Sequence, residues 1–196
     1  KLMTEPTPQK QSHFVIDNFL KEDEWQLIHD HCLHKWTYHS LPVSTSLDEK
    51  QELGDVLFVK GLYSSKYWNE KPDGQCFQSI DSEEIKIIRP LLRELQVGWL
   101  LRMKVNVTPY TGGRYRRNYH SDYTTSNQGK TLGYSCVYYV NTCSGGTEFE
   151  ESGEFVQSIA NRALVFPSYL RHTGISQDDT KYRYIINTNY LTEGAT

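Results

Sequence analysis

The stretch Leu101-Arg102-Met103-Lys104-Val105-Asn106-Val107-Thr108 decides the fold class of this 196-residue chain. Its apolar and polar residues alternate strictly, which is the period of a β-strand with one buried face and one polar face. Seven further strand-like segments follow, with Gly, Asn and Asp turns between them: 115–123, 132–141, 147–150, 154–158, 163–167, 172–175 and 181–190. Short strands with such regular breaks predict a mainly β domain, a sandwich or jelly roll.

The first half of the chain adds short strands, a loop and a helix. Residues 13–20 and 56–60 read as strands, and the polar residues 41–55 read as a loop. Trp25, Ile28 and Cys32 have helical spacing, which predicts a first helix over about residues 22–34.

A second helix is predicted just before the alternating stretch. Asp81 and Glu84 have the spacing of a capping box, and Gly98 is expected to end the helix. Pro90 predicts a kink or a break near Arg89, because proline removes one helical hydrogen bond. The apolar stripe consists of Ile85, Ile88, Leu92 and Leu95. We expect both N-terminal helices to pack on the outside of one sheet, which gives an α+β architecture.

Length and composition indicate one domain of an enzyme-sized, water-soluble protein. We expect residues 1–12 to form a disordered leader and residues 13–196 to form a single domain with its core at 99–191. The net charge of −3 argues against nucleic acid or an anionic membrane as partner, and no apolar run is long enough to span a bilayer. Four cysteines without a C-x-x-C pair, and no signal-peptide core, predict reduced thiols in a cytoplasmic protein.

Three residues with metal-binding side chains stand at an informative spacing. His120 and Asp122 are two positions apart, so on a strand both side chains point to the same face. His172, 50 positions beyond Asp122, is the candidate third ligand. Two histidines and one carboxylate form the triad that suits non-haem Fe(II) in oxygenases. Arg183 follows as a candidate anchor for a dicarboxylate co-substrate, because its planar fork matches a carboxylate. The alternative for a His-x-Asp pair alone is an ordinary surface strand.

The order of several short motifs resembles the 2-oxoglutarate- and Fe(II)-dependent dioxygenases, and most closely their prolyl 4-hydroxylase-like branch. The resemblance covers about residues 105–190. The matching motifs are Val-Asn-Val-Thr-Pro-Tyr (105–110), Tyr-His-Ser-Asp (119–122), Ser-Cys-Val-Tyr-Tyr-Val-Asn (135–141), Gly-Gly-Thr-Glu-Phe (145–149), Asn-Arg-Ala-Leu-Val-Phe (161–166), Arg-His-Thr-Gly (171–174) and Arg-Tyr-Ile-Ile-Asn (183–187).

This resemblance implies a double-stranded β-helix that uses Fe(II), 2-oxoglutarate and O2, with L-ascorbate as a further candidate cofactor. His120, Asp122 and His172 would bind the metal, and Arg183 would pair with 2-oxoglutarate. Tyr110 would face the co-substrate, and Tyr139 would hydrogen-bond the same carboxylate as the arginine. The implied reaction is hydroxylation of an unactivated C–H bond, first of all in a peptidyl proline, with release of succinate and CO2.

Two features depart from the collagen-type enzymes and leave the substrate open. Those enzymes carry Lys at the position of Arg183, and the basic residues Arg114, Arg116 and Arg117 precede His120. The three arginines are either a solvated strand edge or a rim that holds an acidic or polar substrate segment near the iron. A protein or peptide substrate competes with a free amino acid, another small molecule or an alkylated base. A metal-binding jelly roll without turnover is the alternative from outside the enzymes.

Overall fold

The computed structural model describes residues 13–41, 56–65, 82–122 and 133–192, and in them two antiparallel sheets face each other. The larger sheet has the order β1-β8-β5-β10-β4-β3-β2, and the smaller sheet has the order β7-β6-β9. The strands of the larger sheet are β1 (Phe14–Ile16), β8 (Arg162–Pro167), β5 (Tyr134–Tyr139), β10 (Tyr182–Thr192), β4 (Val97–Pro109), β3 (Leu57–Ser64) and β2 (His39–Leu41). Those of the smaller sheet are β7 (Phe155–Gln157), β6 (Gly146–Phe149) and β9 (His172–Ile175). The jelly-roll prediction is therefore confirmed.

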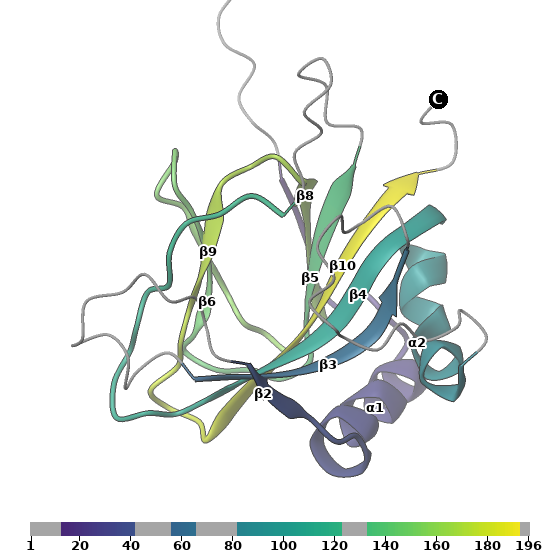
Figure 1. Cartoon of the computed structure of the whole chain (residues 1–196), viewed down its shortest axis with the longest axis horizontal. Helices are drawn as coiled ribbons and strands as arrows, with labels where there is room; N and C mark the ends of the chain where they lie inside the picture. Colours follow the sequence, from purple (N-terminus) through teal and green to yellow (C-terminus); the bar gives the residue numbers. More distant parts are fainter. Residues whose placement is uncertain (1–12, 42–55, 66–81, 123–132, 193–196) are drawn as a thin grey trace, which may run out of the picture.

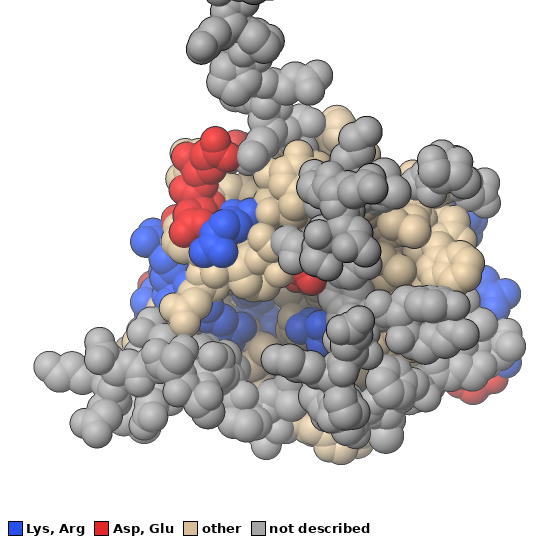
Figure 2. All heavy atoms as spheres, turned by 45° about the horizontal axis from the view of Figure 1, so that its top comes forward, with Lys and Arg blue, Asp and Glu red and all other residues tan. Residues whose placement is uncertain are grey.

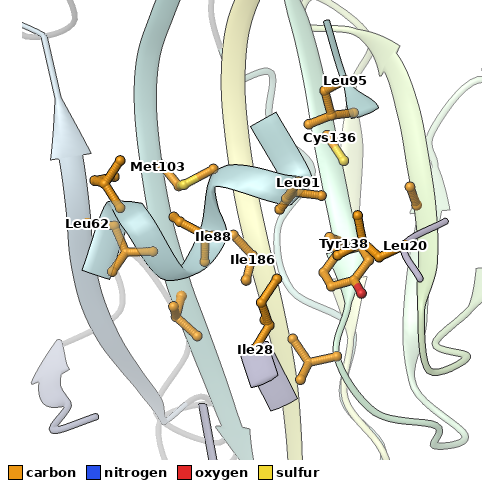
Figure 3. Packing of buried hydrophobic residues seen from close by; sticks show 14 of the residues in the cluster. Leu20, Ile28, Leu62, Ile88, Leu91, Leu95, Met103, Cys136, Tyr138 and Ile186 are labelled. Atoms are coloured by element: carbon orange, nitrogen blue, oxygen red, sulfur yellow. The ribbon is translucent and has the colours of Figure 1, made fainter. Parts of the chain in front are cut away.

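Two helices cover the face of the larger sheet that lies away from the smaller sheet (Figure 1). They are α1 (Glu22–Asp30), which runs on into a π-helical turn, and α2 (Glu83–Glu94). Their apolar side chains pack on the sheet around Ile88, Met103 and Ile186, as Figure 3 shows. The predicted placement of the helices on one sheet is confirmed.

A second apolar cluster fills part of the space between the two sheets. Tyr138 of β5 belongs to the helix-side cluster, whereas its neighbour Tyr139 belongs to the inter-sheet cluster. Phe149 of β6 and Phe166 of β8 close this cluster from the two sheets. The alternation of a β-strand thus gives the larger sheet two buried faces, and the face toward the smaller sheet carries a cavity.

The prediction of a strand over residues 115–123 was wrong. In the described part of this segment only isolated bridges form, between Arg116 and Ile175 and between His120 and His172. The segment runs beside β9 in an irregular, extended conformation.

Of the predicted kink or break near Arg89, the break does not occur, because α2 continues through Pro90 to Glu94. The helix is capped by Ser82, whose hydroxyl accepts a hydrogen bond from the amide of Ile85. The predicted cap Asp81 lies outside the described residues, as does the predicted leader. The three described cysteines, Cys32, Cys136 and Cys143, are buried free thiols. No helix in the described part of the chain has the length and apolar character needed to cross a bilayer.

Candidate metal centre and its cavity

His120, Asp122 and His172 come together although 50 positions separate the last two. Their ligand atoms all lie within 4.8 Å of one another. The Nε2 atom of His120 is 3.7 Å from Oδ1 of Asp122, and that of His172 is 3.9 Å from Oδ2. The backbones of His120 and His172 exchange two hydrogen bonds of 2.9 Å, which hold the irregular segment against β9. Three ligand atoms this close together can bind one divalent cation and leave its other coordination positions open.

Both histidine rings are oriented for metal binding through Nε2. The Nδ1 atom of His172 lies 2.9 Å from the carbonyl of Leu170, and that of His120 lies 3.3 Å from the carbonyl of Asn118. A carbonyl accepts only from a protonated nitrogen, so these contacts favour the tautomer that leaves Nε2 free. Burial lowers the pKa of His120, and the neighbouring His172 lowers it further, although 56% of the His120 side chain is exposed. A neutral ring is the form that binds a metal.

Asp122 is held by two asparagines that the sequence reasoning did not single out. Asn189 donates to its Oδ2 at 3.0 Å, and Asn187 donates to the same oxygen at 3.4 Å. Asn189 also donates to the hydroxyl of Ser135. Burial by itself raises the pKa of Asp122, but the neighbouring His172 and His120 outweigh burial and lower it. The carboxylate is therefore kept ionised, as a metal ligand must be.

The three candidate ligands open onto a cavity of about 340 Å³ between the two sheets. Arg183 of β10 also lines this cavity and is only 3% exposed. Its Nη2 donates to the carbonyl of Gly146 at 3.0 Å, and its Nε has no hydrogen-bond partner. Burial lowers the pKa of Arg183. Among the described residues, no carboxylate is found among the groups that act on the charge of Arg183.

A buried guanidinium without a carboxylate is costly, so this arrangement fits an anionic ligand that completes the site. The donor set fits a divalent metal in the same way, because neutral imidazole and carboxylate are its ordinary ligands. The residues present therefore fit both Fe(II) and a dicarboxylate such as 2-oxoglutarate.

The space around Arg183 depends on two glycines at the start of β6. A Cβ on Gly145 would lie 2.7 Å from the carbonyl oxygen of Ile175 and 3.0 Å from Cδ of Arg183. A Cβ on Gly146 would lie 2.2 Å from the carbonyl oxygen of Val156. The Gly145-Gly146 pair is thus needed for the close approach of β6, β7 and Arg183.

The two predicted tyrosines take different positions. Tyr139 is fully buried, and its hydroxyl donates to Oγ1 of Thr147 at 2.9 Å. Its ring lies 5.7 Å from the guanidinium carbon of Arg183, and Thr147 rather than Tyr139 lines the cavity. Burial raises the pKa of Tyr139 to about 12. Tyr110 is 49% exposed and is not among the described residues that line the cavity.

The three arginines before His120 do not form one surface. Arg117 lines the cavity and donates to the carbonyl of Val56 at 3.3 Å, whereas Arg116 pairs with Glu148 at 3.0 Å. Arg114 lies 5.2 Å from the ring centroid of Phe155. Figure 2 shows basic and acidic atoms close together on one face, with most of the acidic atoms gathered at its upper left. Neither of the two predicted descriptions, a solvated strand edge or a single basic rim, fits all three residues.

Comparison with known proteins places this arrangement in a known fold. No protein family matches the sequence, and no curated protein does. The structure is similar to a prolyl hydroxylase from Trichoplax adhaerens in complex with a hypoxia inducible factor oxygen degradation domain peptide, with 15% identity and a TM-score of 0.61. That match covers 93% of this chain and 84% of the other.

Two further solved structures are similar to this chain. One is a viral collagen prolyl hydroxylase from Paramecium Bursaria Chlorella virus-1 in complex with 2OG, with 13% identity, a TM-score of 0.55 and coverage of 92% and 96%. The other is the non-heme alpha ketoglutarate dependent epimerase SnoN from nogalamycin biosynthesis, with 11% identity, a TM-score of 0.59 and coverage of 93% and 78%. The chain therefore has the double-stranded β-helix fold of the 2-oxoglutarate- and Fe(II)-dependent oxygenases.

Proposed function

We propose that this chain is a 2-oxoglutarate- and Fe(II)-dependent dioxygenase that hydroxylates an unactivated C–H bond. One observation carries the proposal: three metal-ligand side chains and a buried arginine without a carboxylate partner among the described residues line the same cavity. A metal-binding module without turnover would have no use for Arg183 in that place. The oxygenase fold supports the same conclusion.

Each part of the cavity has a role in this proposal. His120, Asp122 and His172 would hold Fe(II), and Arg183 would bind the distal carboxylate of 2-oxoglutarate. When bound, the iron and the co-substrate would supply oxygen activation, with succinate and CO2 as by-products. Thr147, held by the hydroxyl of Tyr139, lies between that tyrosine and the cavity and would help Arg183 to orient the carboxylate. L-ascorbate would serve only to keep the iron reduced.

A peptidyl proline is the substrate that we propose first. Several of the structures similar to this chain are prolyl hydroxylases, and the one from Trichoplax adhaerens is in complex with a peptide. At sequence identities of 13% to 15%, the structural similarity shows the fold alone, and experiment must identify the substrate.

A small polar molecule, such as a free amino acid, is the second candidate, and the wall of the cavity favours it. Lys104, Asn106 and Asn187 line the cavity on β4 and β10, and apolar contacts come only from Leu57, Val137 and Ile185 among the described lining residues. The charge of Lys104 also acts on Asp122 and His120, so an ammonium group stands near the candidate metal position. These polar groups would bind a substrate that carries polar groups of its own.

The test is succinate formation from 2-oxoglutarate by the Fe(II)-loaded protein, with L-ascorbate present, in two parallel panels. One panel contains proline peptides and the other contains free amino acids, and each candidate product is examined for a gain of one oxygen atom by mass spectrometry. We expect His120→Ala to abolish turnover and Arg89→Met, an exposed change on α2, to leave it intact. Stimulation by the amino acids alone would replace the prolyl assignment. Failure of the protein to bind 2-oxoglutarate would contradict the dioxygenase itself.

A further inference from the structure

A row of side chains crosses three extended segments on the outer side of the smaller sheet. Glu148 of β6 is paired with Thr173 of β9, and the bridge between His120 and His172 places Tyr119 beside Thr173. Because side chains alternate along extended chains, Glu148, Thr173 and Tyr119 share the face opposite to His172 and His120. The metal-ligand row and this outer row are therefore two sides of the same backbone.

Glu148 fastens the irregular segment to the sheet across β9. The hydroxyl of Tyr119 donates to Oε1 of Glu148, and Arg116 donates to Oε2 at 3.1 Å. Thr173 is completely buried beneath these contacts, and Glu148 is only 9% exposed. Both hydrogen bonds are charge-assisted, because the acceptor is a carboxylate, and such bonds are strong and directional.

This contact matters because the ring of His120 is held less firmly than its backbone. The His120 side chain is 56% exposed, compared with 4% for His172, and its ring packs against the ring of His172 at 4.6 Å between centroids. Its own side-chain hydrogen bond, to Asn118, is long at 3.3 Å. The position of His120 then follows the backbone of residues 116–120. Backbone hydrogen bonds to His172 and Gly174 hold that backbone on β9, and the side chains of Tyr119 and Arg116 also tie it to β6.

We propose that Glu148 is a positioning residue of the metal centre, which sets the place of His120 by holding Tyr119 and Arg116 over β9. This inference rests on the proposed function, because it needs the triad to bind a metal. Glu148 touches neither metal nor substrate. It acts by making the unloaded site resemble the loaded site, so that less ordering is required when the metal binds.

The experiment is a calorimetric titration of the protein with Co²⁺, combined with the visible absorption of the bound ion. Glu148→Leu removes both contacts, Tyr119→Phe removes only the hydroxyl, and Glu148→Gln keeps an acceptor for Tyr119. Loss of residues that orient metal ligands typically weakens metal binding by about 10-fold or more. We expect Kd to rise by about 10-fold in Glu148→Leu, with a changed Co²⁺ spectrum, by less in Tyr119→Phe, and to recover partly in Glu148→Gln.

A matched control and a double variant separate this role from general destabilisation. Glu151→Leu removes the same charge from an exposed turn three residues further on and should leave Kd and the spectrum unchanged. The double variant Tyr119→Phe, Glu148→Leu should bind Co²⁺ no more weakly than Glu148→Leu alone. The hydrogen bond between Tyr119 and Glu148 is already lost in Glu148→Leu, so Tyr119→Phe removes nothing further. Should Glu148→Leu fail to fold, Tyr119→Phe and Glu148→Gln carry the comparison.

Each outcome decides between the two proposals. If the wild type binds Co²⁺ and the three variants bind it with the same Kd and spectrum, Glu148 does not position the site, even if the melting temperature falls. If the wild type itself does not bind Co²⁺ at the triad, the metal centre is wrong and the positioning role falls with it.

Discussion

Asn189 is the side chain that holds Asp122 most directly, and at the residue scale it shows how β10 supports the metal site. Replacing it with Leu leaves Asp122 with the longer 3.4 Å contact from Asn187. We expect Asn189→Leu to weaken metal binding by about 10-fold, measured as the Kd for Co²⁺. Thr188→Val is the control, since Thr188 is buried on the opposite face of β10 and its hydroxyl has no hydrogen-bond partner among the described residues. Equal affinities of the two variants would contradict the assignment.

Arg183 should affect binding and stability in opposite directions. Its guanidinium is buried without a carboxylate, so Arg183→Met removes a desolvated charge and should leave stability unchanged or raise it by about 1 kcal/mol or more. The same change should abolish 2-oxoglutarate binding, because methionine cannot pair with a carboxylate. Urea unfolding and a 2-oxoglutarate titration measure the two effects. A variant that unfolds more easily would show that the hydrogen bond from Arg183 to the Gly146 carbonyl stabilises the fold by more than burial of the charge costs.

The residues of the site differed in how far the sequence could predict them. The sequence could predict four of them, because histidine and aspartate are typical metal ligands and arginine typically binds carboxylates: His120, Asp122, His172 and Arg183. Asn187 and Asn189 gave no such signal alone, although both lie at even spacing from Arg183 and so share its strand face. The exposed position of Tyr110 was not predictable, because motif spacing gives no information on where a loop side chain points.

At the element scale, the close approach of β6 and β7 makes Gly146 a test of how the Arg183 end of the cavity is built. A Cβ there would lie 2.2 Å from the backbone oxygen of Val156, so Gly146→Ala must push the two strands apart. We expect a loss of about 1–3 kcal/mol in stability together with weaker 2-oxoglutarate binding, because the Gly146 carbonyl holds Arg183.

Gly153→Ala separates backbone strain from crowding. Gly153 has φ +66° and no atom within 4 Å of an added Cβ, so alanine there costs only conformational strain. It should lower the melting temperature and leave 2-oxoglutarate binding as in the wild type. Wild-type affinity in Gly146→Ala would mean that Arg183 does not depend on β6.

The elements with strong periodic patterns were predicted correctly, and the irregular ones were not. The alternation at 101–108 predicted most of β4, and the segment 181–190 corresponds to β10. The segment 115–123 has aromatic and charged residues that look strand-like, but in its described part, residues 115–122, the backbone pairs with β9 at isolated bridges only. Pro90 did not break α2, because the buried stripe of Ile85, Ile88 and Leu91 holds the helix on the sheet on both sides of it.

At the scale of the whole molecule, binding at the inter-sheet cavity should stabilise the fold. The candidate ligands come from a segment outside the sheets and from β9, while Arg183 comes from the larger sheet. A metal and 2-oxoglutarate together would therefore connect both sheets. At 100 times Kd each ligand should add about 2.7 kcal/mol to the free energy of unfolding, which scanning calorimetry detects as a higher melting temperature. A chelator should reverse the increase, and an unchanged melting temperature would argue that neither ligand binds the folded chain.

The central claim is that the metal and 2-oxoglutarate bind in the same cavity and that Arg183 binds a carboxylate of 2-oxoglutarate there. Anaerobic titration of the Fe(II)-loaded protein with 2-oxoglutarate tests it most directly, through the weak visible charge-transfer band of the chelated metal. We predict that the band appears in the wild type, weakens strongly in Arg183→Ala and persists in Arg89→Met. Iron binding without a band in the wild type would contradict the claim and would leave a metal-binding jelly roll without the oxygenase reaction.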